Sequence, residues 1–435
     1  MTQPMPKLEQ FRLEIKDNGL VHLIFDAPGR TMNVFSEAAI VELGTFARWV
    51  AASDVRGALI RSGKDTAFCA GADLGELGFA YDMIMNTPLP SRFNAAFDHF
   101  FRLSLAIRAL ETSGKPVAAA IAGLALGGGC ELALGAHYRV LSTDPRATLG
   151  LPESLVGLLP GGGGTQRLPR LVGIETALPI LLEGARLSGE AALKAGLVDA
   201  LAAPGDEVAT AERWLLSATS PRQIWDRPDW AAPSPIEVST ALTPVRQGIL
   251  ATTLGHYPAP LAILDCVEFG LVQCFDGAIR SEMAIFAHLI QRPEARNMIQ
   301  TLFLGKTDFE RLNRKSQMPG FVTEVIAAAR SAIEEADIGA DALAAVGFSR
   351  VGLARVAPVR QATLPGYWVT GDGDDPRRRK ALALLRRISE AVAPWSASRS
   401  KEELRIADYA VVRELGYPAY LGGPFAFAAA QENQG

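Results

Sequence analysis

The sequence predicts an α/β protein that continues into an all-α C-terminal region. Residues 117–121 (VAAAI) form a short apolar run typical of a buried strand, and the glycines after it open a helical pattern. Residues 10–16 and 20–25 alternate as the two strands of a β-hairpin do, across Asn18-Gly19, a favoured tight-turn pair. In the second half of the chain the spacing of apolar residues is helical.

The composition is that of an ordinary globular protein. A chain of 435 residues is expected to hold two to four domains at roughly 150 residues each. The net charge of −4 argues against nucleic acid or an anionic membrane as a partner. We expect no signal peptide and no membrane span, and therefore a cytoplasmic location. The four cysteines, without CxxC spacing, indicate reduced buried thiols: Cys69, Cys130, Cys266 and Cys274.

Local signals predict several further elements. Ser36 and Asp73 are favoured helix N-caps, and a helix over about 37–53 follows the first of them. Residues 56–62 are typical of the next strand. Residues 80–113 are helical and amphipathic, with an aromatic stripe that is expected to pack in the core or line a pocket.

Two glutamates stand in apolar, glycine-rich surroundings. Glu131 follows Gly127–Gly129, and Glu153 precedes Gly161–Gly164, where another helix begins near residue 165. Burial and mutual repulsion raise the pKa of at least one such carboxyl, as general acid–base catalysis near neutral pH requires. The alternative is that each glutamate caps a helix or pairs with an arginine. The candidates for that pairing are Arg139 and Arg167.

Three sequence blocks carry a resemblance to a known family. They are AFCAGADLGEL at 67–77, GLALGGGCEL at 123–132 and LPESLVGLLPGGGGTQRLPRLVG at 151–173. The second and third resemble the two signature blocks of the crotonase (enoyl-CoA hydratase/isomerase) superfamily almost residue for residue, and the first occupies the place expected upstream of them. One departure is the stretch 142–147, which looks like a small hairpin insertion around the turn signal Asp144-Pro145.

The resemblance implies a crotonase-like ββα spiral domain and a set of site residues. The backbone amides of Ala72 and Gly128 would hold a thioester oxygen, and Glu131 and Glu153 would act on the acyl group. No metal or redox cofactor is expected, because CoA arrives as part of the acyl-CoA thioester substrate. The implied CoA contacts are Arg30, Met32, Ala70, Gly71, Asp73 and Leu74.

The resemblance also divides the chain into three segments. Residues 1–205 are the expected catalytic domain, and residues 206–318 a linker and helical extension, in which 218–247 lack clear periodicity. Within the extension, YPAP, QCFDGAIRSE and ARNMIQTLF resemble the alpha subunits of multifunctional fatty-acid oxidation complexes. Residues 319–435 resemble a truncated C-terminal domain of 3-hydroxyacyl-CoA dehydrogenase.

The dehydrogenase half of those relatives has an NAD-binding Rossmann domain. We find no strand–GxGxxG–helix unit in the sequence, and we expect neither that domain nor NAD. The remaining helical segment carries a basic run at 377–380 and Arg386-Arg387, which we interpret as a solvated helix face.

The resemblance implies an enoyl-CoA hydratase, a lyase that adds water syn across the C2=C3 bond of trans-2-enoyl-CoA thioesters. The pathway would be fatty-acid β-oxidation or a related acyl-CoA degradation, and residues 75–100 would set the accepted chain length. One alternative is a Δ3-Δ2-enoyl-CoA isomerase, which needs a single base. Another is a non-catalytic scaffold for a thiolase or dehydrogenase partner. The resemblance is also compatible with a homo-oligomer.

Overall fold

The computed structural model describes residues 4–65, 67–218, 221–253, 255–336, 343, 346–348 and 376–432. They form two compact units. The first comprises residues 1–242 and 262–288, and the second residues 243–261 and 289–435. The three segments predicted from the sequence stay a prediction, and part of the segment 319–435 lies outside the described residues.

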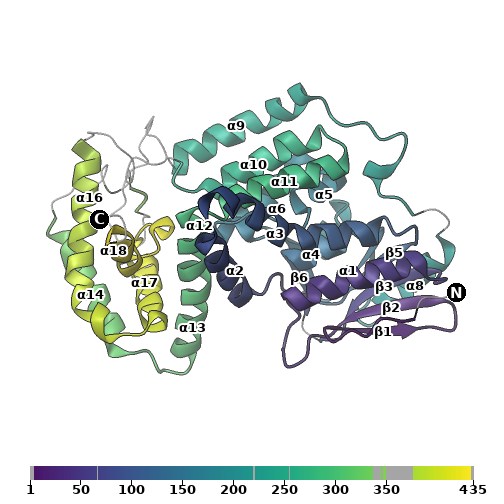
Figure 1. Ribbon diagram of the computed structural model, residues 1–435, viewed down its shortest axis with the longest axis horizontal. Coiled ribbons are helices and arrows are strands. Elements are labelled where there is room, and N and C mark those ends of the chain that lie inside the picture. The colour runs from purple at the N-terminus through teal and green to yellow at the C-terminus, as the bar shows by residue number, and fades with distance from the viewer. Residues whose placement is uncertain are drawn as a thin grey trace. The chain divides into compact units, whose positions relative to one another are not determined.

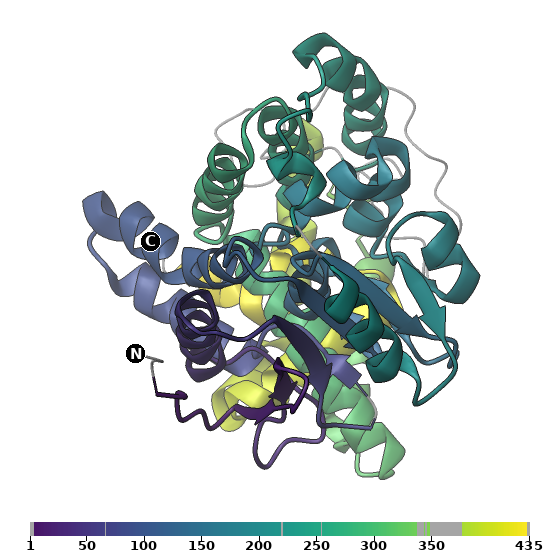
Figure 2. The same ribbon diagram turned by 90° about the vertical axis from the view of Figure 1, so that its right-hand side faces the viewer.

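A six-stranded sheet forms the centre of the first unit, with the hairpin of β1 and β2 at one edge (Figures 1 and 2). The strands in order are β1 (Phe11–Ile15), β2 (Leu20–Phe25), β3 (Gly57–Ser62), β5 (Val117–Ile121), β7 (Tyr138–Ser142) and β10 (Ala200–Ala202). The predicted hairpin is confirmed, and Gly19 adopts the positive φ of 82° that its turn requires. All other neighbouring strands of this sheet run parallel.

A second sheet has four strands, in the order β4 (Ala67–Cys69), β6 (Leu124–Leu126), β8 (Thr148–Gly150) and β9 (Arg186–Ser188). The chain alternates between the sheets, so β3, β5 and β7 of the first are followed by β4, β6 and β8 of the second. This repeat is the expected ββα spiral. The predicted hairpin at 142–147 is wrong, because β7 and β8 belong to different sheets. Asp144 instead closes a turn between them by accepting the Arg146 N–H at 2.8 Å.

Helices surround the two sheets. They are α1 (Glu37–Ala52), α2 (Leu74–Asn86), α3 (Leu89–Glu111), α4 (Gly128–Leu134), α5 (Gly164–Val172), α6 (Ile174–Glu183), α7 (Gly189–Lys194) and α8 (Glu207–Ser217). The predicted caps are confirmed: Ser36 accepts the Ala39 N–H, and Asp73 accepts two amides of the first turn of α2. The helical stretch over 80–113 is interrupted at Thr87, which is extended (ψ 139°) because a proline follows it.

Residues 218–247 are more regular than the sequence analysis suggested. After a 3₁₀ turn, η2 (Ile224–Asp226), helix α9 runs from Pro235 to Thr253. Ser234 and Glu237 satisfy each other's backbone amides at its start, at 2.9 and 3.2 Å, which is a capping box. Helices α10 (Pro258–Leu271) and α11 (Phe275–Leu289) follow.

The second unit is helical throughout its described residues. It contains α12 (Pro293–Met298), a π-helical segment η3 (Ile299–Gly305), α13 (Lys306–Arg314), α14 (Gly320–Glu334), α16 (Pro376–Val392), α17 (Lys401–Leu415) and α18 (Pro424–Glu432). Helices α14, α16, α17 and α18 lie around a common apolar core (Figure 1). The described part of the basic run is exposed, as predicted: Arg379, Lys380, Arg386 and Arg387.

Two further expectations concern thiols and membranes. Cys69, Cys130 and Cys266 are free and buried, but Cys274 is exposed, so that part of the prediction is wrong. Among the described helices, none has the length and apolarity needed to cross a membrane.

Candidate active site

A cavity of about 420 Å³ opens in the first unit. Its lining includes four residues that the sequence predicted, and which the structure brings together from three separate segments: Ala72, Gly128 and Glu131 of α4, and Glu153. The rest of the wall is largely apolar. Such a cavity, with a few convergent polar groups, is the usual form of a small-molecule site.

The backbone around Ala72 is held in place by its neighbours. The Phe35 N–H donates to Gly71 O at 2.8 Å, and the Asp73 N–H donates to Phe35 O at 2.9 Å. Gly71 has a φ of 100°, a conformation that favours glycine. Among the described residues, we find no acceptor for the Ala72 N–H itself, although this residue lines the cavity.

Gly128 supplies a second amide that has no acceptor in the part of the chain that the structure describes. It is the first residue of α4, where the N–H has no partner within the helix. The packing here leaves no room for side chains. A Cβ at Gly128 would lie 3.1 Å from the Phe35 ring, and a Cβ at Gly127 would lie 2.7 Å from Glu153 Oε1. Two backbone donors therefore face one cavity that also holds carboxylates.

Glu131 is 2% exposed. Its Oε1 accepts the N–H groups of Gly162 at 2.6 Å and Gly164 at 2.8 Å. Burial raises the pKa of this carboxyl to about 7, although the two amides and the charge of Arg167 act in the opposite direction. The helix-cap alternative is thus partly correct, because Glu131 binds the first turn of α5 while it lines the cavity.

Glu153 begins a 3₁₀ turn, η1 (Glu153–Val156). Its Oε2 is buried, and no described residue hydrogen-bonds to it. Burial, followed by the charge of Glu131, raises its pKa well above the ordinary value. The arginines considered in the sequence analysis bind other carboxylates, Arg139 pairing with Asp199 at 2.8 Å and Arg167 with Glu111 at 3.0 Å. Burial therefore favours the protonated form of both carboxyl groups.

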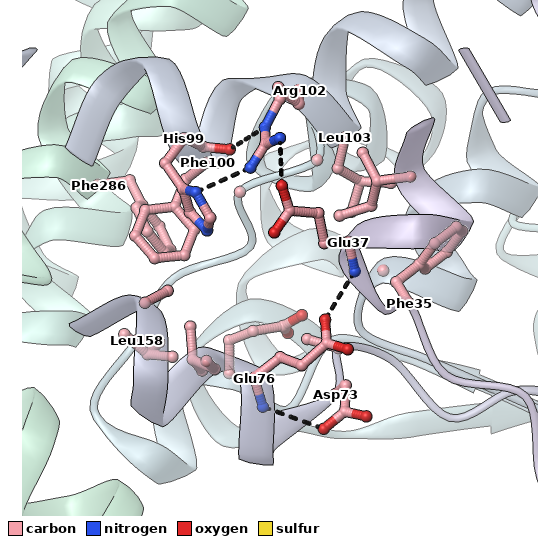
Figure 3. A pocket seen from close by; sticks show the side chains of 18 of the residues that line it. Phe35, Glu37, Asp73, Glu76, His99, Phe100, Arg102, Leu103, Leu158 and Phe286 are labelled. Atoms are coloured by element: carbon pink, nitrogen blue, oxygen red, sulfur yellow. Dashed lines mark hydrogen bonds and ion pairs between the residues drawn. The ribbon is translucent and has the colours of Figure 1, made fainter. Parts of the chain in front are cut away.

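A polar wall faces this arrangement (Figure 3). Arg102 of α3 pairs with Glu37 of α1 at 2.8 Å and lies 2.8 Å from His99 Nδ1. The Glu37 N–H donates to Glu76 of α2 at 2.7 Å. These contacts fix three helices around the cavity. Beside His99, the labelled Phe100, Phe286 and Leu158 form an apolar surface (Figure 3).

The predicted CoA contacts lie mainly outside the cavity, and only Asp73 among them lines it. Arg30 is exposed and forms an ion pair with Asp73. Met32 is 42% exposed, and the Ala70 N–H donates to Asn33 O. Leu74 is the first residue of α2. Their role in binding CoA stays a prediction. In the described part of the chain, no group of His, Cys, Asp and Glu side chains gathers as metal ligands.

Two residues of the site lie on α11 and were missed in the sequence analysis. Phe286 lines the cavity, and Glu282 is fully buried beside the glycine-rich turn. A signal for them exists, because Ala278, Glu282 and Phe286 follow at intervals of four and occupy one helix face. A glutamate within such a buried stripe indicates a specific polar partner.

The sequence comparisons agree with this geometry. Residues 16–220 match the model of the enoyl-CoA hydratase/isomerase family, and through this segment the chain belongs to that family. The fatty acid oxidation complex subunit alpha of Shewanella amazonensis is 35% identical over 305 residues, covering 69% of this chain and 42% of that protein. The homologous subunit of Shewanella frigidimarina is 35% identical over 308 residues, covering 69% and 41%. The chain thus matches about two fifths of the length of these relatives.

One solved structure is also similar to part of this chain. An enoyl-CoA hydratase from Bacillus anthracis is 28% identical, with 50% of this chain and 79% of that chain covered and a TM-score of 0.42.

Proposed function

We propose that this protein is an enoyl-CoA hydratase that adds water across the C2=C3 bond of trans-2-enoyl-CoA thioesters. The observation that carries the proposal is the meeting of two buried carboxyl groups, Glu131 and Glu153, with two unpaired amides, Ala72 and Gly128, in one largely apolar cavity. Family membership supports the same class of reaction.

In the proposed reaction the two amides receive the thioester oxygen. As water adds to C3, negative charge moves onto this oxygen, and donors aimed at it stabilise the enolate-like transition state. Each such donor contributes roughly 3–4 kcal/mol. The site needs no cation to stabilise this charge, since the oxygen on which it develops would lie against backbone N–H groups that the fold already holds in place.

The carboxyls would carry the protons. Glu131, ionised and held by two amides, orients one water and takes its proton as oxygen bonds to C3. Glu153, protonated, gives its proton to C2 on the same face. A proton then returns from Glu131 to Glu153, which restores the starting state. The raised pKa of both groups supports this division, because one carboxyl keeps its proton near pH 7.

An isomerase acting on 3-enoyl-CoA is the second candidate. The observation in its favour is the unpaired Oε2 of Glu153, which alone could serve as the single base that isomerisation needs. A non-catalytic scaffold is less well supported, because burying two carboxyl groups in a largely apolar cavity is costly, the more so for Glu153, whose Oε2 has no hydrogen-bond partner among the described residues.

The proposal also covers the metabolic role of the protein, its partners and its location. The matched relatives are named as subunits of fatty acid oxidation complexes, which supports a role in β-oxidation or a related acyl-CoA degradation. A partner such as a thiolase or a separate dehydrogenase, a homo-oligomer and a cytoplasmic location are parts of the same proposal. Hydration itself calls on no cofactor beyond the CoA of the substrate.

The test is turnover of conjugated thioesters by the purified protein. We expect absorbance of crotonyl-, decenoyl- or hexadecenoyl-CoA to be lost, and the rate to fall by roughly 10²–10⁴-fold in Glu131→Gln and in Glu153→Gln. Both variants should still bind butyryl-CoA, a saturated thioester that cannot be hydrated. Binding of every thioester without turnover of any enoyl-CoA would refute the hydratase proposal. Loss of activity in Glu153→Gln alone, with conversion of 3-enoyl-CoA, would favour the isomerase.

A further inference from the structure

We infer that Glu282 is a positioning residue of this site. It holds the glycine-rich turn of residues 161–165 in place, and it extends to more alkaline pH the range in which the Glu131–Glu153 pair can act. The inference rests on the proposed function. Glu282 lies on α11, outside residues 16–220, which match the family model, and outside the three sequence blocks that identify the site.

The geometry of the turn is the first argument. Glu131 accepts the N–H groups of Gly162 and Gly164. Glu282 accepts the N–H groups of Gly163 at 2.8 Å and Thr165 at 3.0 Å, which alternate along the chain with the two that Glu131 accepts. The two carboxylates therefore bind alternate amides of one turn. Displacing either of them moves the donors of the other.

The side chain of Thr165 completes this attachment. Its hydroxyl donates to Glu282 Oε2 at 2.5 Å and accepts from Gln166 Nε2 at 2.9 Å. Gln166 Nε2 also donates to Cys266 O of α10, at 2.8 Å. Glu282 is 0% exposed, so water cannot replace these contacts. The turn that binds Glu131 is thus fixed by the later part of the chain.

Charge is the second argument. Burial, and then the charge of Glu131, raises the pKa of Glu282 to about 8. The charge of Glu282 in turn adds to the raised pKa of Glu153. Above this pH an ionised Glu282 therefore opposes loss of the proton that Glu153 must donate. The charged and titratable groups that face Glu282 are Glu131, Glu153, Arg167, Arg170 and Cys266.

A purely structural role for Glu282 makes a different prediction, since it would affect stability and not proton transfer. Glu282→Gln removes the charge and keeps the shape, whereas Glu282→Asp keeps the charge on a shorter side chain. Asp276→Asn is the matched control, because Asp276 lies on the same helix, its side chain is 68% exposed and its ion pair is with Arg108 and not with the turn.

The experiment measures kcat/KM for enoyl-CoA hydration against pH. We expect Glu282→Gln to shift the alkaline limb to lower pH by about one unit, because a like charge near the general acid is lost. Glu282→Asp should keep the wild-type alkaline limb even if kcat falls, and Asp276→Asn should keep the whole profile. An unchanged limb in Glu282→Gln, with only a lower melting temperature, would overturn the inference.

The same variants separate this inference from the proposed function. If the wild type hydrates no enoyl-CoA, the hydratase proposal fails, and the Kd of butyryl-CoA is then measured against pH. A pH dependence of that Kd which shifts in Glu282→Gln and not in Asp276→Asn would support the coupling of Glu282 to the cavity. Equal pH dependence in all three proteins would overturn it.

Discussion

Glu111 and Arg167 form an ion pair in which neither side chain is exposed to solvent. Arg167 Nη2 lies 3.0 Å from Glu111 Oε2, and Arg167 Nη1 donates to Gly162 O at 2.8 Å. Glu111 is the last residue of α3, and Gly162 is an amide donor to Glu131. The pair therefore joins α3 to the turn whose amides bind the carboxyl group of Glu131.

We predict that Glu111→Gln strongly destabilises the protein. The change leaves the Arg167 guanidinium buried without its counter-charge, which costs about 3–5 kcal/mol. At about 2–4 °C per kcal/mol, the melting temperature should fall by about 6–20 °C in scanning calorimetry. The control is Asp144→Asn, which breaks a pair with Arg146, a side chain that is 74% exposed. Similar small shifts in both variants would contradict the importance of the buried pair.

A second prediction concerns Gly162. A Cβ at this position would lie 2.6 Å from Glu131 Oε2, so alanine must displace the carboxylate while the backbone N–H remains. Misplacing a catalytic group by about 1 Å can cost roughly 100-fold in rate, and we expect a loss of that order in kcat for Gly162→Ala. Gly78→Ala is the control, because a Cβ there meets nothing within 4 Å. Hydration rates close to wild type in both variants would argue against this geometry.

Much of the site could be predicted from the sequence because its signals are local. Ser36 and Asp73 are residue types that favour the N-cap position, and each predicts the start of the helix that follows it. The glycines before Glu131 and after Glu153 mark places where backbone and carboxylate approach closely, and at Gly127 and Gly162 the structure leaves no room for a Cβ. The resemblance of the three sequence blocks to the crotonase family then grouped Glu131 and Glu153 into one predicted site.

What the sequence analysis missed has two causes. The break at Thr87-Pro88 and the capping box of Ser234 and Glu237 carried local signals that were overlooked. The contact of Glu282 with the glycine-rich turn is different in kind. It joins residues more than one hundred positions apart in the sequence. No local sequence pattern predicts which turn a buried carboxylate will contact in the folded chain.

The pH dependence of stability gives a third prediction. Folding raises the pKa of Glu131 to about 7, that of Glu282 to about 8, and that of Glu153 well above its ordinary value. In the unfolded chain these groups titrate near about 4.3. Above that pH the folded protein holds protons that the unfolded chain has released, so its stability falls as pH rises, until the folded carboxyls are also ionised.

We therefore expect the melting temperature to fall between about pH 7 and about pH 8.5, a window where histidines are mostly neutral in both states. The buried thiols of Cys69 and Cys130, whose pKa values are also raised, contribute with the same sign. The double variant Glu131→Gln/Glu153→Gln removes the contribution of these two carboxyl groups and should make the fall smaller, leaving that of Glu282 and the thiols. A wild-type melting temperature that rises over this window, or an equal fall in both proteins, would show that the carboxyls are ionised in the folded state at neutral pH.

The last prediction concerns the length of the acyl chain. The rings of Phe100 and Phe286 lie 4.9 Å apart with their planes tilted by 58°, and both line the cavity. Phe286→Ala removes one of them and enlarges the apolar end of the cavity. Each methylene that gains or loses a contact in an apolar pocket changes kcat/KM by roughly 10-fold or more. We expect the ratio of kcat/KM for decenoyl-CoA over crotonyl-CoA to rise by at least about tenfold. The control is Phe269→Ala on α10, where the side chain is 55% exposed and does not line the cavity. If kcat/KM falls by the same factor for both substrates in Phe286→Ala, the ring supports the fold, and the accepted length of the acyl chain is set elsewhere in the cavity.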